Sequence, residues 1–218
     1  MAFGLPKGLI REIEKRLRSF LWKGITGSGH AKVAWTRVCT PVEEEGIGIQ
    51  NLFALNMAMM AKKLWAVIQR DSKSIWAQWV YQVRLRERTV WTASLTSISW
   101  SWRKLLRLRT VLLPHLTFCI GDGTRFSLWH DPWHHLGPLI IRFPLGPNIT
   151  GAHNTAPLHG MIVDGCWHWP TILDIGYVEI THDLPTIHGG QDAIMWNAGS
   201  GRFTNDVAYE LFQPRGPK

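Results

Sequence analysis

The chain has 218 residues, and 45% of them are hydrophobic, which is enough to bury one substantial core or two small ones. This composition excludes a disordered chain as the default. Three cysteines, odd in number and far apart, argue against a disulfide framework and favour a reducing, intracellular environment. The basic residues near the N-terminus and the short apolar run around 52–61 lead us to expect no secretory signal and no membrane partner.

The net charge of +8 is concentrated in the N-terminal half. Residues 1–110 hold 19 Lys and Arg against 7 Asp and Glu, whereas residues 111–218 hold 5 against 9. This asymmetry is typical of contact with nucleic acid or another anionic surface, and a solvated basic face is the alternative. The thirteen tryptophans are spread from Trp22 to Trp196, which indicates packing anchors.

The first predicted element is an amphipathic helix in "LPKGLIREIEKRLRSFLWKG", which opens near Pro6 and stops at Gly24. Two separate faces follow from the helical period of about 100° per residue. The apolar face comprises Ile10, Ile13, Leu17, Phe20 and Leu21. The basic stripe comprises Lys7, Arg11, Lys15 and Arg18. We expect the apolar face to pack and the basic stripe to be available for phosphates, although a solvated charged face stays the alternative.

Further helices are expected in the rest of the N-terminal half. "KVAWTRVC" alternates apolar and polar residues and predicts a short extended segment. A largely buried helix should span about 52–69, a shorter one 74–81, and another 99–109. The last helix presents Arg103, Lys104 and Arg107 together as further nucleic-acid-binding candidates. The tryptophans near these basic stretches are candidates for stacking on bases, namely Trp22, Trp35 and Trp102.

After Pro114 the helical periodicity fades, and "LTFCIGDGTRFSLWH" predicts a tryptophan-rich β-hairpin with its turn at Gly-Asp-Gly. Both aspartates of this region are interpreted as turn or cap residues and the tryptophans as scaffold. The structural motif comprises Gly121, Asp122, Gly123, Trp129, Asp131, Pro132 and Trp133. A long irregular connection should cover 137–160, followed by an Asp-Gly turn in "VDGCWHW". "PTILDIGYVEITHDLP" is ambiguous, and a final helix should span 205–212.

Ten histidines and three cysteines invite a metal site, but their spacing does not support one. Close pairs occur at His115 with Cys119, His130 with His134, and Cys166 with His168, and none fits the two-pair pattern of a tetrahedral zinc site. No Gly-x-Ser-x-Gly elbow or phosphate-cradling glycine loop followed by Lys and Ser/Thr occurs either. We therefore expect no catalytic residue, no metal and no cofactor, and a metallohydrolase built on the Asp/His-rich loop is a disfavoured alternative.

Seven segments, in their order along the chain, carry a resemblance to a known family: "LPKGLIREIEKRLRSFLWKG", "KVAWTRVCTPVEEEGIGIQNLFALNMAMMAKKLWAV", "IWAQWV", "SWSWRKLL", "CIGDGTRFSLWHDPW", "VDGCWHW" and "MWNAGSGRFTNDVAYELF". Together they resemble the C-terminal third of the reverse transcriptases of plant LINE-type, non-LTR retrotransposons. The resemblance spans nearly the whole chain, and "IGDGTRFSLWHDPW" alone resembles a signature of that family. It implies a thumb and connector that follow the polymerase palm and lead into a zinc-binding domain.

Two kinds of departure from the family limit what the resemblance implies. No Asp-Asp pair, the family's polymerase motif, occurs in the chain, so we expect a truncated, non-catalytic fragment rather than an enzyme. Glu45 stands where the family usually has a glycine, and Asn205 and Asp206 replace a common Val-Lys pair, which removes a possible phosphate contact. A thumb holds a primer–template duplex by its backbone, and this strengthens the assignment of the basic stripe.

The resulting expectation is an α+β protein with a basic, helical, thumb-like region at 1–112 and a Gly/Pro/His-rich connector at 113–218. The expected partner is RNA or an RNA–DNA hybrid, bound weakly and in a salt-sensitive way, with no small-molecule substrate. The alternative is an inert retroelement remnant or a host protein-interaction module without a nucleic-acid role.

Overall fold

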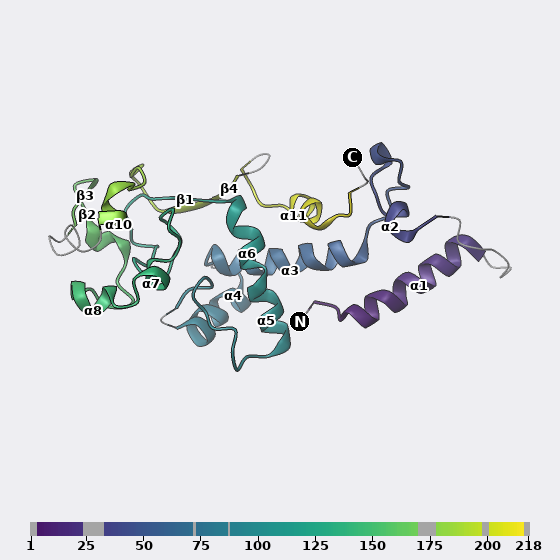
Figure 1. Cartoon of the computed structure of the whole chain (residues 1–218), viewed down its shortest axis with the longest axis horizontal. Helices are drawn as coiled ribbons and strands as arrows, with labels where there is room; N and C mark the ends of the chain where they lie inside the picture. The colour runs from purple at the N-terminus through teal and green to yellow at the C-terminus, as the bar shows by residue number, and fades with distance from the viewer. Residues whose placement is uncertain are drawn as a thin grey trace. The chain divides into compact units, whose positions relative to one another are not determined.

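The computed structural model describes residues 4–23, 33–71, 73–86, 88–169, 178–197 and 201–215 (Figure 1). The α+β class is confirmed, because helices are accompanied by small antiparallel sheets. The longer helices are α1 Lys7–Lys23, α3 Leu52–Ile68, α5 Trp100–Arg107 and α11 Asn205–Phe212. The short helices are α2 Trp35–Val38, α4 Ile75–Trp79, α6 Arg109–Leu112, α7 Leu139–Arg142, α8 Gly146–Thr150 and α10 Val178–His182. The strands are β1 Leu116–Cys119, β2 Ile162–Val163, β3 Cys166–Trp167 and β4 Ala193–Trp196.

Two expectations fall on residues outside this description: Gly24 as the stop of the first helix, and the first half of the ambiguous segment, residues 170–177. Four short helical turns complete the described secondary structure: η1 Val42–Glu44, the π-helical η2 Val80–Leu85, η3 Leu113–His115 and η4 Leu158–Met161. No helix in the described ranges is long and apolar enough to cross a membrane.

The chain forms two compact units, which do not follow the change in composition at residue 112. The first unit comprises residues 1–63 and 203–218, and the second comprises 64–202, so the division passes through α3. The predicted regions 1–112 and 113–218 reflect charge and glycine content, whereas compactness depends on contacts between segments distant in sequence. Their role as functional domains stays a prediction.

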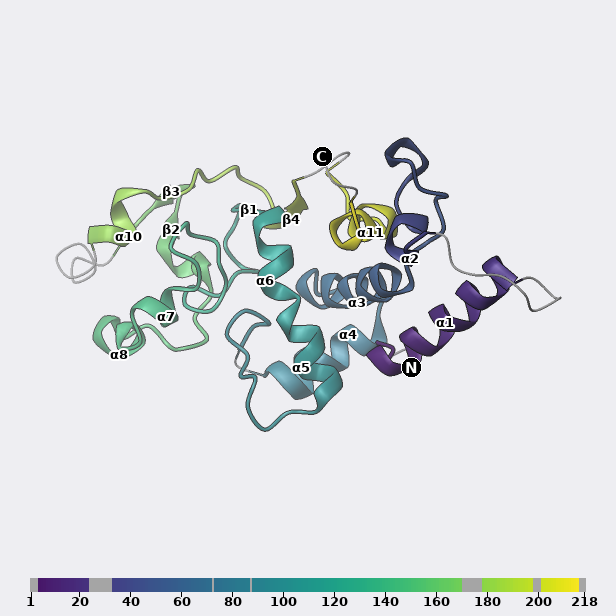
Figure 2. The ribbon, with the colours of Figure 1, turned by 45° about the vertical axis from the view of Figure 1, so that its right-hand side comes forward.

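In the first unit, the N-terminus of α3 is joined to Tyr209 in the middle of α11. Asn51 caps α3, because its Oδ1 accepts the backbone N–H of Ala54 at 2.9 Å. The backbone N–H of Asn51 donates to the hydroxyl of Tyr209 in α11 at 2.8 Å. Figure 2 shows α11 beside α3, and the predicted final helix is confirmed with Thr204 as its N-cap. The C-terminal segment is thereby held to the first unit.

The predicted α1 helix forms, but most of its apolar face does not pack within the described residues. Ile10 is buried, whereas Leu17 and Leu21 are exposed and Phe20 is 71% exposed. The reason is Trp22, which packs against the buried cluster around Trp35 in α2 and lies on nearly the opposite side of α1 from Phe20. Packing of Trp22 therefore turns Phe20 outwards, and the expectation that this whole face is buried is wrong.

The prediction that "KVAWTRVC" is extended is also wrong. Residues 35–38 form the single helical turn α2, in which the N–H of Cys39 donates to the carbonyl of Trp35 at 3.1 Å. Trp35 and Val38 are both buried. Three residues of apolar alternation cannot distinguish a strand from a helical turn that buries positions i and i+3.

In the second unit, the predicted helices over 74–81 and 99–109 are confirmed with changed ends. Ser74 and Ser99 cap α4 and α5, since their side chains accept the N–H groups of Ala77 and Trp102. The helix that begins with α4 continues as the π-helical turn η2, and α5 is followed directly by α6. These elements lie between α3 and the connector in the sequence.

The predicted β-hairpin around Gly-Asp-Gly is wrong, because β1 does not pair with the residues that follow it. β1 pairs with β4 in antiparallel register, from Leu116 opposite Trp196 to Cys119 opposite Ala193. The segment 121–126 consists of bends instead of a strand. A Gly-Asp-Gly sequence indicates only a local change of backbone direction. The strand that pairs with β1 is β4, which lies more than 70 residues later in the sequence.

The rest of the connector contains more regular structure than expected. The Asp-Gly turn in "VDGCWHW" joins β2 and β3, and both Asp164 and Gly165 have positive φ angles of 50° and 74°. The stretch 137–160, predicted to be irregular, contains α7 and α8. Both helices are too short for a periodic apolar pattern, so the sequence pattern missed them.

Candidate functional site

The basic stripe of α1 is solvent-exposed along its whole length. Lys7, Arg11, Lys15 and Arg18 are all exposed. The Nε of Arg18 donates to the carbonyl of Glu14 one turn earlier, at 3.3 Å, and leaves the guanidinium at the surface. Four cationic side chains on one helical face can contact successive phosphates of a nucleic-acid backbone without reading its sequence.

The three basic residues predicted on α5 do not form a single exposed surface. Arg103 is partly buried and donates to two backbone carbonyls, those of Leu95 at 3.0 Å and Ile98 at 3.4 Å. The Nζ of Lys104 lies 5.2 Å from the centroid of the Trp100 ring, and Arg107 is exposed. The structure therefore uses Arg103 to hold the preceding loop, whereas Lys104 and Arg107 remain candidates for phosphate contact.

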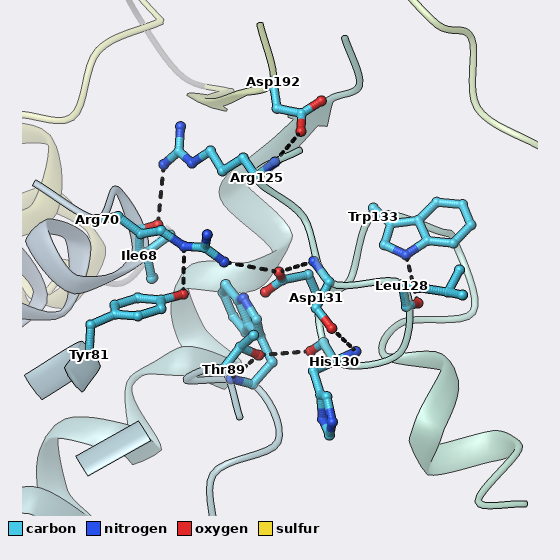
Figure 3. A network of polar contacts seen from close by, with 12 residues as sticks. Ile68, Arg70, Tyr81, Thr89, Arg125, Leu128, His130, Asp131, Trp133 and Asp192 are labelled. Carbon is cyan, nitrogen blue, oxygen red and sulfur yellow. Dashed lines mark hydrogen bonds and ion pairs between the residues drawn. The ribbon is translucent and has the colours of Figure 1, made fainter. Parts of the chain in front are cut away.

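A buried polar network in the second unit surrounds Asp131 (Figure 3). Its Oδ2 accepts the backbone N–H of Ser127 at 2.8 Å, which makes Asp131 the cap of a local turn. The same oxygen lies 3.8 Å from a guanidinium nitrogen of Arg70. Arg70 also donates to the hydroxyl of Tyr81 at 2.8 Å, and its guanidinium lies 4.7 Å from the centre of that ring. The network thus joins the residues after α3, the π-helical turn and the "WHDPW" segment.

Burial is the largest cause of the pKa shifts in this network. Burial raises the pKa of the Asp131 carboxyl to about 6, although the Ser127 N–H and the Arg70 charge both act to lower it. Burial also raises the pKa of Tyr81 and lowers that of Arg125, which the charge of Arg70 lowers further. The penalty of removing Asp131 from water therefore exceeds the gain from a single guanidinium at 3.8 Å.

The space left inside the network is small. A cavity of about 10 Å³ is bordered by the side chains of Arg70, Tyr81, Thr89, Arg125 and Asp131, among others. This volume suits one water molecule and no larger ligand. The backbone of Arg70 has a positive φ of 50°, so its position is held by the surrounding contacts. The arrangement is that of a structural polar core, and it offers no room for a substrate.

Asp192 organises the Gly-Asp-Gly loop, and the sequence analysis missed it. Its buried carboxylate accepts three backbone N–H groups, from Gly121 at 2.8 Å, Gly123 at 3.0 Å and Arg125 at 2.9 Å. The guanidinium of Arg125 in turn donates to the carbonyl of Ile68 at 3.3 Å. The only sequence signal for this role is an aspartate directly before the short apolar segment that forms β4.

The residues of the Gly-Asp-Gly turn have separate local roles. A Cβ on Gly121 would lie 2.4 Å from the carbonyl oxygen of Gly190, and Gly123 has a φ of 69°. Asp122 accepts the N–H and the hydroxyl of Thr124, and these bonds lower the pKa of its carboxyl. Asp122 therefore stabilises its own turn, whereas Gly121 allows the loop to lie against the backbone of residues 190–191 and Gly123 allows it to lie against the backbone of His159.

The remaining motif residues lie in the interior of the second unit. Trp129, Pro132 and Trp133 are buried, and the Nε1 of Trp133 donates to the carbonyl of Leu128 at 3.0 Å (Figure 3). Trp129 lies against Gly146, where a Cβ would lie 2.5 Å from the indole ring. These residues support packing and do not form an exposed binding surface.

The histidines of this segment are bound to protein groups. His130 lies between the hydroxyl of Thr92 at 2.7 Å and the amide oxygen of Asn154 at 3.2 Å, and burial lowers its pKa. His134 contacts the carbonyl of Ile180 at 3.2 Å, and burial lowers its pKa as well. Within the described part of the chain, no group of three His, Cys, Asp or Glu side chains is arranged to hold a metal ion.

The structure thus brings Asp131 together with arginines that the sequence analysis did not select, and it separates the seven predicted basic residues between two compact units. The tryptophans selected for stacking are not the accessible ones. Trp35 is buried, and Trp22 and Trp102 are partly buried. The accessible tryptophans in the described ranges include Trp79 and Trp100, which the sequence analysis passed over.

Comparison with known proteins places the chain near two Arabidopsis thaliana proteins. It is 30% identical over 223 aligned positions to a putative ribonuclease H protein, and the match covers 95% of this chain and 35% of that protein. It is 26% identical over 137 positions to an uncharacterized mitochondrial protein, covering 60% of this chain and 86% of the relative. No family model and no solved structure matches the chain. The chain therefore has plant relatives, and it spans about a third of the length of the first of them.

Proposed function

We propose that the chain is a retrotransposon-derived, reverse-transcriptase-like segment of the thumb and connector type, and that it binds RNA or RNA–DNA hybrids through their backbone. The order of the seven segments and the likeness to a putative ribonuclease H protein support this origin. In this proposal the chain does not polymerise nucleotides by itself, because its sequence holds no paired aspartates. Its contribution is affinity for the nucleic acid.

One observation supports the binding function most directly: all four basic residues of the α1 stripe are exposed. Lys and Arg side chains that replace condensed counterions make binding depend steeply on salt. For about four phosphate contacts on a duplex, the affinity should fall roughly 100-fold between about 50 and 200 mM salt. Such contacts follow the backbone and do not discriminate between sequences.

The test is the binding of the purified chain to a fluorescent RNA–DNA hybrid of mixed sequence, measured by anisotropy over that salt range. Replacing Lys7, Arg11, Lys15 and Arg18 by glutamine should weaken binding at low salt and reduce the slope by about one per residue. The loss should be equal for unrelated hybrid sequences. Absence of binding at low salt, or binding that does not respond to salt, contradicts the proposal.

A matched control separates the stripe from net charge alone. Glutamine replacements at Arg37, Lys62, Arg142 and Arg202 remove the same four charges from exposed positions outside α1. These changes should alter the affinity much less than the α1 variant, since they do not lie along one helical face. Equal losses in the two variants would show that the chain binds by general charge and that α1 has no special role.

The exposed apolar residues of α1 favour a second candidate, a protein-interaction module. Leu9, Leu17 and Phe20 leave an apolar surface on a different side of the helix from the basic stripe. Replacing Leu17 and Phe20 by serine should leave hybrid binding intact if nucleic acid is the partner. If the α1 glutamine variant binds hybrid as well as the original chain does, the protein-interaction module becomes the better account.

A further inference from the structure

Two tryptophans of the second unit are exposed, and each has a cation at its ring. Trp79 in α4 is 43% exposed, and the guanidinium carbon of Arg84 lies 5.4 Å from its ring centroid. Trp100 in α5 is 54% exposed, and the Nζ of Lys104 lies 5.2 Å from its ring centroid. Most of the large rings of this unit are buried or partly buried, so these two expose an unusual amount of aromatic surface.

The chain around these rings carries a strong positive charge. Residues 73–112 contain eight Lys and Arg and a single acidic residue. Arg86, Arg88 and Arg107 are exposed within this stretch. Figures 1 and 2 both show α4 and α5 as neighbours in this unit. An anionic polymer is therefore attracted to the segment that presents both rings.

We infer that Trp79 and Trp100 form a stacking site for unpaired nucleotides of single-stranded RNA or DNA. The inference rests on the proposed nucleic-acid function and extends it to a second site, in a different compact unit from the α1 stripe. A base stacks on an indole face whatever its sequence, and a nearby Lys or Arg supplies the charge for the adjoining phosphate. A duplex does not satisfy such a site, because its bases already stack on one another.

The charges beside the two rings favour a nucleic-acid strand over an apolar protein surface as the partner of this site. Each of the two rings is accompanied by a cation, and an apolar partner would have to remove that cation from water. A phosphate beside a stacked base would instead pair with Arg84 or Lys104. Ile75 lies in α4 together with Trp79 and is 83% exposed. It has apolar area but no aromatic face, so its replacement tests whether apolar area alone accounts for binding.

The experiment measures anisotropy of labelled oligouridine, oligothymidine and an RNA–DNA hybrid of equal length with the full chain. Replacing Trp79 or Trp100 by alanine should weaken binding of each single strand about tenfold or more, and leave binding of the hybrid unchanged. Phenylalanine at the same positions should restore most of the affinity. The Ile75→Ala variant is the matched control and should bind all three probes as the original chain does.

The outcomes distinguish this inference from the proposed function. Single-strand binding that is unchanged in both alanine variants, or that falls equally in Ile75→Ala, overturns the stacking site and leaves the α1 proposal standing. Hybrid binding that falls in the α1 glutamine variant and not in the tryptophan variants, together with single-strand binding that falls in the tryptophan variants, supports both. Circular dichroism of each variant confirms that the substitutions at these exposed positions leave the fold intact.

Discussion

The two compact units differ in how they use some of their basic side chains. In the first unit, the stripe on α1 is exposed to solvent, and its charges are available to a partner. In the second unit, several arginines donate to the chain itself: Arg103 and Arg109 to loop carbonyls, and Arg125 to the end of α3. Guanidinium groups suit this task, since their five donors can satisfy several carbonyls at once. A count of basic residues therefore overestimates the surface available for phosphates.

The largest effect should come from removing the carboxylate that holds the Gly-Asp-Gly loop. Asp192→Ala leaves three backbone N–H groups without their acceptor, so we expect the free energy of unfolding to fall by about 3–5 kcal/mol. Urea denaturation followed by tryptophan fluorescence measures this change. Asp122→Ala is the control and should cost much less, because it removes only bonds within one turn. Equal costs would refute the distinction between the two aspartates.

A clash in the same loop should have the next largest effect. Gly121→Ala places a Cβ 2.4 Å from the carbonyl oxygen of Gly190, and backbone must shift to relieve it. We expect a loss of about 2–4 kcal/mol, measured as a lower urea midpoint. At Gly160, a Cβ meets nothing within 4 Å, so Gly160→Ala should be close to neutral. A stable Gly121→Ala protein would mean that the loop does not lie against residues 190–191.

The buried carboxyl of Asp131 should make stability depend on pH. Its pKa is about 6 in the fold and near 4 in the unfolded chain, so the folded state binds more protons between these values. The free energy of unfolding should therefore fall by about 1–3 kcal/mol as pH rises from about 4 to 6, and stay lower above that range. Asp131→Asn removes this titration. The difference in the free energy of unfolding between the original chain and the variant, measured at each pH, therefore gives the contribution of Asp131. A difference that does not vary with pH contradicts the assignment.

The smallest effects on stability are expected from replacing Arg103 and Arg107, two arginines of α5. Arg103→Gln should cost about 1–2 kcal/mol of stability and leave nucleic-acid binding unchanged, because its donors already bind carbonyls. Arg107→Gln should leave stability within about 0.5 kcal/mol, since Arg107 is exposed. It should reduce the salt dependence of single-strand binding if it contacts phosphate. Thermal unfolding and anisotropy, applied to both variants, test the two halves of this comparison.

The sequence allows the local elements of this fold to be predicted better than their partners. α1, α3 and α11 follow from the spacing of their apolar residues along the sequence. The β1–β4 pairing and the role of Asp192 could not be predicted, because each depends on residues about 70 positions apart: Gly121 and Asp192 are separated by 71. The candidate tryptophans were chosen by nearness to charge in the sequence, whereas exposure depends on what packs around each ring.

The link between β1 and β4 also determines when the second unit can form. The "GDGTR" loop stays without its carboxylate until residue 192 has been synthesised, and β1 has no partner until β4 follows. When paired strands are this far apart in the sequence, the chain loses the entropy of loop closure before the strands make contacts. This loss slows folding. We therefore expect a ribosome-bound chain that ends before residue 190 to expose an unpaired strand edge, and to complete this unit only after β4 has been synthesised.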